Sequence, residues 1–78
     1  PWRVREAAIY SIEQGHTQYT SNYGLRELRE EISRYLCDLY SVAYNPAHEI
    51  LVTVGVSEAL DVTFRALLNP GDEVLIPE

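Results

Sequence analysis

The stretch Thr53-Val54-Gly55-Val56-Ser57-Glu58-Ala59-Leu60 marks the point where an apolar run gives way to a helical pattern. Residues 50–54 are apolar and rich in β-branched side chains, which favours a strand that is buried on both faces. Gly55 ends this run, and a helix-favouring sequence starts within two or three residues. The stretch therefore predicts a strand, a tight turn and a helix N-terminus in succession.

A corner of this kind is a general binding site for anions. The first backbone N–H groups of a helix have no intrahelical partner, and the helix dipole favours negative charge beside them. Gly55 allows the backbone to approach a ligand closely, and Val56 should keep a negative φ because it is β-branched. Ser57 has two interpretations, since its hydroxyl either caps the helix or donates to a phosphate.

The remaining pattern predicts an α/β fold in the order helix, helix, strand, helix, strand. We expect helices over residues 1–15, 25–39 and 57–68, and strands over residues 50–54 and 74–76, without an internal domain boundary. The second helix has the clearest apolar periodicity, and the third repeats it more briefly. Their expected buried residues are Leu25, Leu28, Ile32, Leu36 and Leu39, then Leu60, Phe64, Leu67 and Leu68.

The charges of the chain point away from nucleic acid. Its 78 residues carry a net charge of −6, and the six positive charges are all arginine. No basic patch is available to neutralise a phosphate backbone. The charged side chains of the second helix, Arg29 among them, should form a solvated face with a Glu30–Arg34 pair at i,i+4 spacing.

The cysteine and histidine residues predict neither a disulfide nor a metal site. Cys37 is the single cysteine and falls in a helical pattern, where we expect a buried or half-buried inert thiol. His16 and His48 are isolated and should be surface residues. With no signal peptide or long apolar segment in the sequence, we expect a cytoplasmic protein that does not enter a membrane.

Three blocks in register resemble the class I/II aminotransferases, enzymes of fold type I that depend on pyridoxal 5′-phosphate (PLP). The blocks are Gln18-Tyr19-Thr20-Ser21-Asn22-Tyr23-Gly24-Leu25 with Glu27-Leu28-Arg29, then residues 50–60, then Asn69-Pro70-Gly71-Asp72-Glu73-Val74. The resemblance covers nearly the whole chain. It implies that residues 1–78 are an incomplete part of the three-layer large domain of an enzyme that moves an amino group between an amino acid and a 2-oxo acid.

The resemblance also implies roles for four residues. Gly55, Val56 and Ser57 match the turn that holds the PLP phosphate, through the amides of Val56 and Ser57 and the Ser57 hydroxyl. Tyr19 matches a tyrosine that crosses a homodimer interface to the phosphate of the partner's cofactor; the alternative for Tyr19 is a packing role.

The family holds its cofactor covalently through a lysine, and this chain contains none. We therefore expect no catalytic residue among the 78 and no activity from them alone. Two rival interpretations remain open. The chain could be a truncated, non-catalytic relative that binds a partner or an anion, or the parent could be a transcription regulator with an aminotransferase-like domain.

Overall fold

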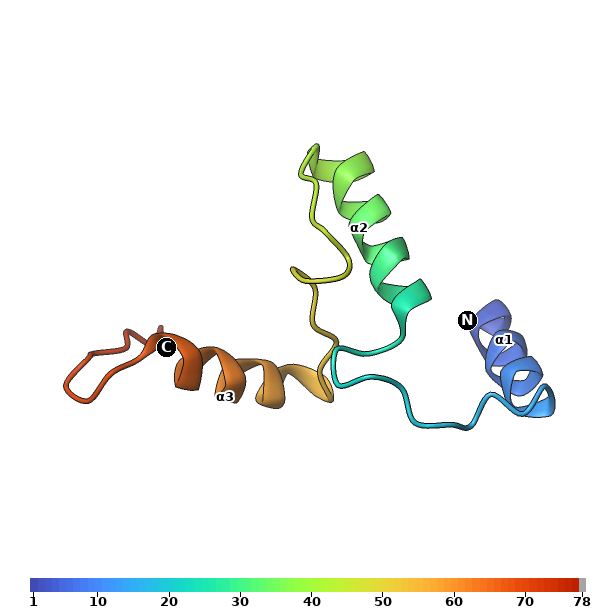
Figure 1. The fold of residues 1–78 in the computed structure, drawn as a ribbon, viewed down its shortest axis with the longest axis horizontal. Coiled ribbons are helices and arrows are strands. Elements are labelled where there is room, and N and C mark those ends of the chain that lie inside the picture. The colour runs from blue at the N-terminus through green and yellow to red at the C-terminus, as the bar shows by residue number, and fades with distance from the viewer. Residues whose placement is uncertain (78) are drawn as a thin grey trace.

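The computed structural model describes residues 1–77 and contains three helices joined by irregular segments (Figure 1). Helix α1 spans Trp2–Glu13, α2 spans Arg26–Tyr40 and α3 spans Gly55–Leu67. All three predicted helices are confirmed. The start of α3 differs from the prediction, because the helix begins at Gly55 and not at Ser57.

The predicted strands are not formed within residues 1–77. Residues 50–54 and 74–76 are irregular, so the strand part of the α/β prediction is unconfirmed. The physical reason is the need for a partner, since a strand is stable only when its N–H and C=O groups pair with a neighbouring strand. In this chain, residues 50–54 make one backbone hydrogen bond to another segment, from the Val52 N–H to the Tyr23 carbonyl at 3.0 Å.

The structure has no hydrophobic core in residues 1–77. None of the apolar side chains is buried, and no helix packs against another. Figure 1 shows α2 and α3 diverging from residues 50–54, with α1 set apart beyond the loop that precedes α2. The radius of gyration is 16.3 Å, whereas a compact domain of this length has about 11.5 Å. The expected buried faces of α2 and α3 are therefore largely exposed here.

One region of α2 does have tertiary contacts. The segment after the helix runs back along it, and the Ser33 hydroxyl donates to the Tyr44 carbonyl at 2.6 Å (Figure 1). Ile32, Leu36 and Ile50 are half-buried around a small hollow between the helix and this segment. These contacts hold residues 44–52 against α2, directly ahead of the corner at Gly55.

Three details of the predicted α2 surface were wrong. Arg29 is buried, with 7% of its surface exposed, although we expected it on the solvated face. Cys37 is exposed, because no other segment of residues 1–77 covers it. The ion pairs are Arg26–Glu30 at 2.8 Å and Glu31–Arg34 at 2.6 Å, so Arg34 has a different partner from the one predicted.

Candidate functional site: the turn at Gly55

The corner before α3 is a tight turn followed directly by the helix. Val54 has φ −79° and ψ 73°, and the Gly55 N–H donates to the Thr53 carbonyl at 2.9 Å. This is an inverse γ-turn. Gly55 follows it with φ +82°, a backbone conformation that residues other than glycine rarely adopt. A Cβ atom at Gly55 would meet no atom within 4 Å, so the space beside the turn is open.

The chain satisfies most of the hydrogen-bonding groups at this corner by itself. The Val54 N–H donates to the Glu58 carboxylate, and the Thr53 hydroxyl donates to the Gly55 carbonyl at 3.1 Å. Within residues 1–77, the amides of Val56 and Ser57 have no hydrogen-bond partner in the chain. Two adjacent donors at the positive end of a 13-residue helix are therefore left for another group.

Val56 and Ser57 both lie in the first turn of α3 and are exposed. The N-cap of α3 is Val54 and no side chain caps the helix, so the interpretation of Ser57 as an N-cap is wrong. Ser57 lies inside the first turn with an exposed side chain. Val56 is among the residues without a positive φ, as expected for a β-branched residue. The amides of both residues and the Ser57 hydroxyl are available to a ligand.

The acidic residues of α3 have structural partners. Glu58 reaches back to the Val54 amide, a local role that we did not predict. Asp61 accepts a hydrogen bond from the Arg65 Nε at 2.8 Å. This bond holds the pKa of Asp61 below its usual value and raises the pKa of Arg65. Glu58 is thus bonded to the N-cap residue of α3, and Asp61 is paired within the helix.

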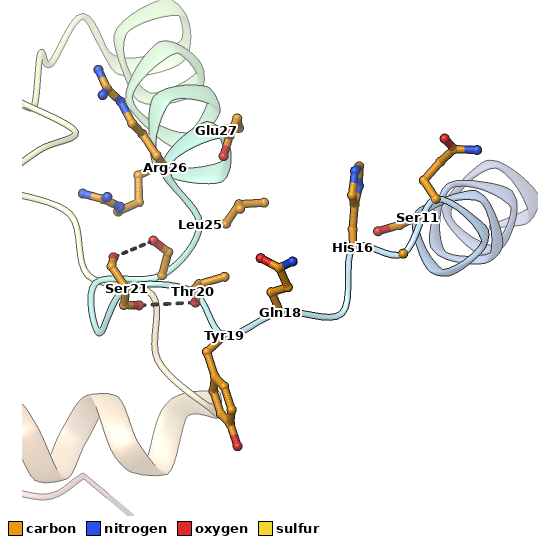
Figure 2. A pocket seen from close by; sticks show the side chains of 13 residues that line it. Ser11, His16, Gln18, Tyr19, Thr20, Ser21, Leu25, Arg26 and Glu27 are labelled. Atoms are coloured by element: carbon orange, nitrogen blue, oxygen red, sulfur yellow. Dashed lines mark hydrogen bonds between the residues drawn. The ribbon is translucent and has the colours of Figure 1, made fainter.

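Tyr19 lies in the loop before α2 and is fully exposed. Figure 2 shows its ring projecting away from the labelled side chains of α2. The described residues include no hydrogen bond from its hydroxyl to the corner. Tyr19 is therefore exposed to solvent within residues 1–77 and makes no hydrogen bond to the turn at Gly55.

The loop that carries Tyr19 is nevertheless attached to the segment that leads to the corner. Gly24 has φ +90°, and a Cβ atom there would lie 2.5 Å from the Val52 Cβ. The neighbouring Tyr23 carbonyl accepts the Val52 N–H. These contacts join the loop before α2 to a residue three positions ahead of Gly55.

An open groove of about 980 Å³ lies between the end of α1 and the start of α2 (Figure 2). Polar side chains such as His16, Gln18 and Arg26 line much of it, and Tyr19 stands at its edge. The corner at Gly55 does not line this groove. His16 and His48 are exposed, as predicted.

Residues 1–77 have neither a cluster of metal-binding side chains nor a helix that could span a membrane. Among them, no cluster of three or more His, Cys, Asp or Glu side chains has the geometry of a metal site. The same residues contain no helix with the length and apolar character required to cross a bilayer.

Arg29 is the structural residue that sequence reasoning missed. A signal for it was present, because Arg29 follows Leu25 by four positions and precedes Ile32 by three, which places it on the apolar stripe of α2. We had assigned it to the solvated face by residue type.

Comparison with known proteins identifies the family. The family model for class I and II aminotransferases matches residues 1–78. The chain is 60% identical over 77 residues to "Putative aminotransferase YugH" of Bacillus subtilis (strain 168), covering 99% of this chain and 20% of that protein. It is 45% identical over 74 residues to the aspartate aminotransferase of Sulfurisphaera tokodaii, covering 95% of this chain and 18% of the relative.

A third relative is the aspartate aminotransferase of Geobacillus stearothermophilus, 43% identical over 77 residues, with 99% of this chain and 19% of the relative covered. The chain spans about a fifth of the length of these relatives. No solved structure matches it. The relatives are named aminotransferases, so the interpretation as part of a transcription regulator is not supported. The chain belongs to the class I and II aminotransferase family.

Proposed function

We propose that this chain supplies the phosphate-binding turn of a PLP-dependent aminotransferase, which transfers an amino group between an amino acid and a 2-oxo acid. Family membership supports the reaction class, and relatives of this chain are named aspartate aminotransferases. Within that enzyme, this chain would bind the PLP phosphate and orient the cofactor. The residues that would contact the cofactor are Gly55, Val56 and Ser57, with Tyr19 from the loop before α2.

One observation carries this proposal. The amides of Val56 and Ser57 are adjacent, lack a partner in residues 1–77, and lie at the positive end of α3. The Gly55 amide donates to the Thr53 carbonyl and the Val54 amide donates to the Glu58 carboxylate. A phosphate offers several acceptor oxygens and a double negative charge, which suits two free N–H groups, a hydroxyl and a helix N-terminus. The residues present therefore fit the phosphate of PLP.

When bound, PLP supplies the electron sink for reactions of amino acids. The turn holds the phosphate end, and this attachment fixes the direction in which the rest of the cofactor lies. Gly55 keeps the space beside the amides free of a side chain, which allows the phosphate to come within hydrogen-bonding distance. Val56 turns its backbone N–H to the ligand without strain, because its φ is not positive.

Tyr19 would act between two copies of the protein. Its side chain is fully exposed and has no partner on the corner of its own chain. A phenol O–H is a suitable donor to a phosphate oxygen. We propose a homodimer in which Tyr19 reaches the cofactor phosphate of the partner subunit. The protein would work in the cytoplasm, where its single cysteine, Cys37, stays a free thiol.

The rival proposal is a truncated relative that performs no reaction. The specific observation in its favour is the composition, because none of the 78 residues is a lysine. Intact mass spectrometry of the protein purified from its natural source separates the two. A mass near 8.9 kDa would support the truncated relative, whereas a mass several times larger would support an enzyme that contains this chain.

Cofactor binding tests the main proposal directly. The full-length protein should bind PLP covalently and transfer amino groups when given an amino acid and a 2-oxo acid. The 78-residue chain should bind PLP weakly, because a few hydrogen bonds of about 1 kcal/mol each must offset the translational and rotational entropy lost on binding. That loss costs at least ~4 kcal/mol. It should gain no cofactor mass on a lysine. A full-length protein that neither binds PLP nor transfers amino groups would contradict the proposal.

Gly24 gives a prediction about how the loop and the corner are held together. Gly24→Ala should destabilise the full-length protein, because a Cβ atom would overlap the Val52 side chain and the positive φ would become strained. Gly71→Ala is the matched control, since Gly71 has φ +99° but open space around it. Denaturant unfolding should show Gly24→Ala to be the less stable variant by about 1–3 kcal/mol. Equal stabilities would contradict the close approach of Gly24 to Val52.

A further inference from the structure

Arg29 is the one buried side chain in residues 1–77, and its contacts come from two segments outside its own helix. It lies on α2, and its Nη1 donates to the carbonyls of Pro46 and Ala47, the latter at 3.4 Å. Its guanidinium stands 5.8 Å from the centroid of the Tyr23 ring, in cation–π geometry. One guanidinium therefore joins α2, the loop before it and the segment after it.

The two segments that Arg29 contacts are both connected to the turn at Gly55. Tyr23 accepts the Val52 N–H at its carbonyl, and Val52 lies three residues ahead of Gly55. Pro46 and Ala47 belong to the segment after α2, which runs back along the helix to the same corner (Figure 1). The residues between Ala47 and Val52 are thus held at both ends by contacts that involve Arg29 or the residue it stacks on.

The choice of arginine at this position has a physical reason. The planar guanidinium donates along fixed directions while its face lies on an aromatic ring, and an ammonium group cannot do both in the same way. The Arg29 Nε is buried and has no hydrogen-bond partner within residues 1–77, which lowers stability. The side chain is thus placed to fix geometry between segments, and not to add surface charge.

We propose that Arg29 is a positioning residue for the cofactor phosphate: by fixing residues 46–52 against α2 and Tyr23, it sets where the free amides of Val56 and Ser57 point. The inference rests on the proposed function of that turn. Arg29 itself touches no cofactor. Its effect on PLP passes through Tyr23 and Val52 to the corner.

The test compares cofactors with and without a phosphate in the full-length protein. Arg29→Gln replaces the charged guanidinium with a neutral amide, whereas Arg29→Lys keeps the positive charge but loses the planar guanidinium. We expect the affinity for PLP to fall roughly tenfold in Arg29→Gln, the equivalent of about one hydrogen bond, and by less in Arg29→Lys. The affinity for pyridoxal, which has no phosphate, should not change in either variant. Equilibrium dialysis with absorbance detection measures both ligands.

Arg34→Gln is the matched control, because Arg34 lies on the same helix but is exposed and paired with Glu31. It should leave the affinity for both ligands unchanged. A parallel loss of PLP and pyridoxal affinity in the Arg29 variants would overturn the inference and indicate general unfolding. A lower melting temperature with unchanged PLP affinity would overturn it too. If Arg29→Gln does not fold, the smaller change in Arg29→Lys gives the same comparison.

Ser57→Asp, measured alongside, separates this inference from the function on which it rests. If Ser57→Asp retains PLP, the phosphate role of the turn fails. If Ser57→Asp loses PLP and the Arg29 variants do not, the turn binds the phosphate and only the positioning role of Arg29 is wrong.

Discussion

Ser57→Asp in the full-length protein should weaken the retention of PLP by roughly 100-fold or more. The substitution places a carboxylate at the first turn of α3, beside the amides that would hold the phosphate. Two unit charges about 4 Å apart near a protein surface interact by about 4 kcal/mol, and about 3 kcal/mol is enough for a 100-fold change. The rate at which PLP is lost during dialysis, followed by absorbance, measures the effect.

Two further variants show whether the charge is the cause. Ser57→Ala removes only the hydroxyl and should weaken PLP binding by about one hydrogen bond, or ~1 kcal/mol. Arg34→Ala changes an exposed pair on α2 and should leave PLP retention as it is. Unchanged retention in Ser57→Asp would remove the phosphate role assigned to this turn.

The 78-residue chain on its own should not behave as a compact folded monomer. In residues 1–77 no apolar side chain is buried and no helix packs against another, so little hydrophobic free energy opposes the entropy of the unfolded chain. The chain also presents apolar segments at residues 50–54 and 74–76, and most of their backbone groups are open to other chains. We expect association, aggregation or disorder in sedimentation velocity experiments.

Thermal and denaturant unfolding followed by circular dichroism complement this measurement. The helical signal of the isolated chain should decrease gradually, without a cooperative transition, because isolated helices of 12 to 15 residues are marginal in water. A monomer in sedimentation that also unfolds in one sharp transition would prove this prediction wrong.

The helices were predictable because their information is local. The apolar spacing along residues 25–39 and the turn residues around Gly15 and Pro70 determine helix positions within two residues. The strands depend on partners elsewhere, so the pattern of residues 50–54 indicates a buried strand that this chain cannot pair by itself. The prediction that Cys37 is buried rested on the helical pattern alone and was wrong, because Cys37 is exposed.

The candidate site divides in the same way. The turn follows from Gly55 and the helix start, and unpaired N–H groups in the first helical turn were expected from the residues. The choice of Val56 and Ser57 among them came from the family resemblance. The contacts of Arg29 with Pro46 and Ala47 were not predicted, because they join residues 17 and 18 positions apart. The residue type of Arg29 alone suggested an exposed side chain. The role proposed for Tyr19 depends on a second subunit, which a single sequence does not describe.

The exposure of apolar side chains in residues 1–77 determines which substitutions the short chain can accept. Leu60, Phe64 and Leu67 of α3 are each more than a third exposed here, so replacing them with polar residues should not harm the chain alone and should even improve its solubility. In an assembled enzyme the same replacements would disrupt packing. Parallel substitution scans of the short chain and of the full-length protein would therefore map, residue by residue, the surface that the rest of the protein covers.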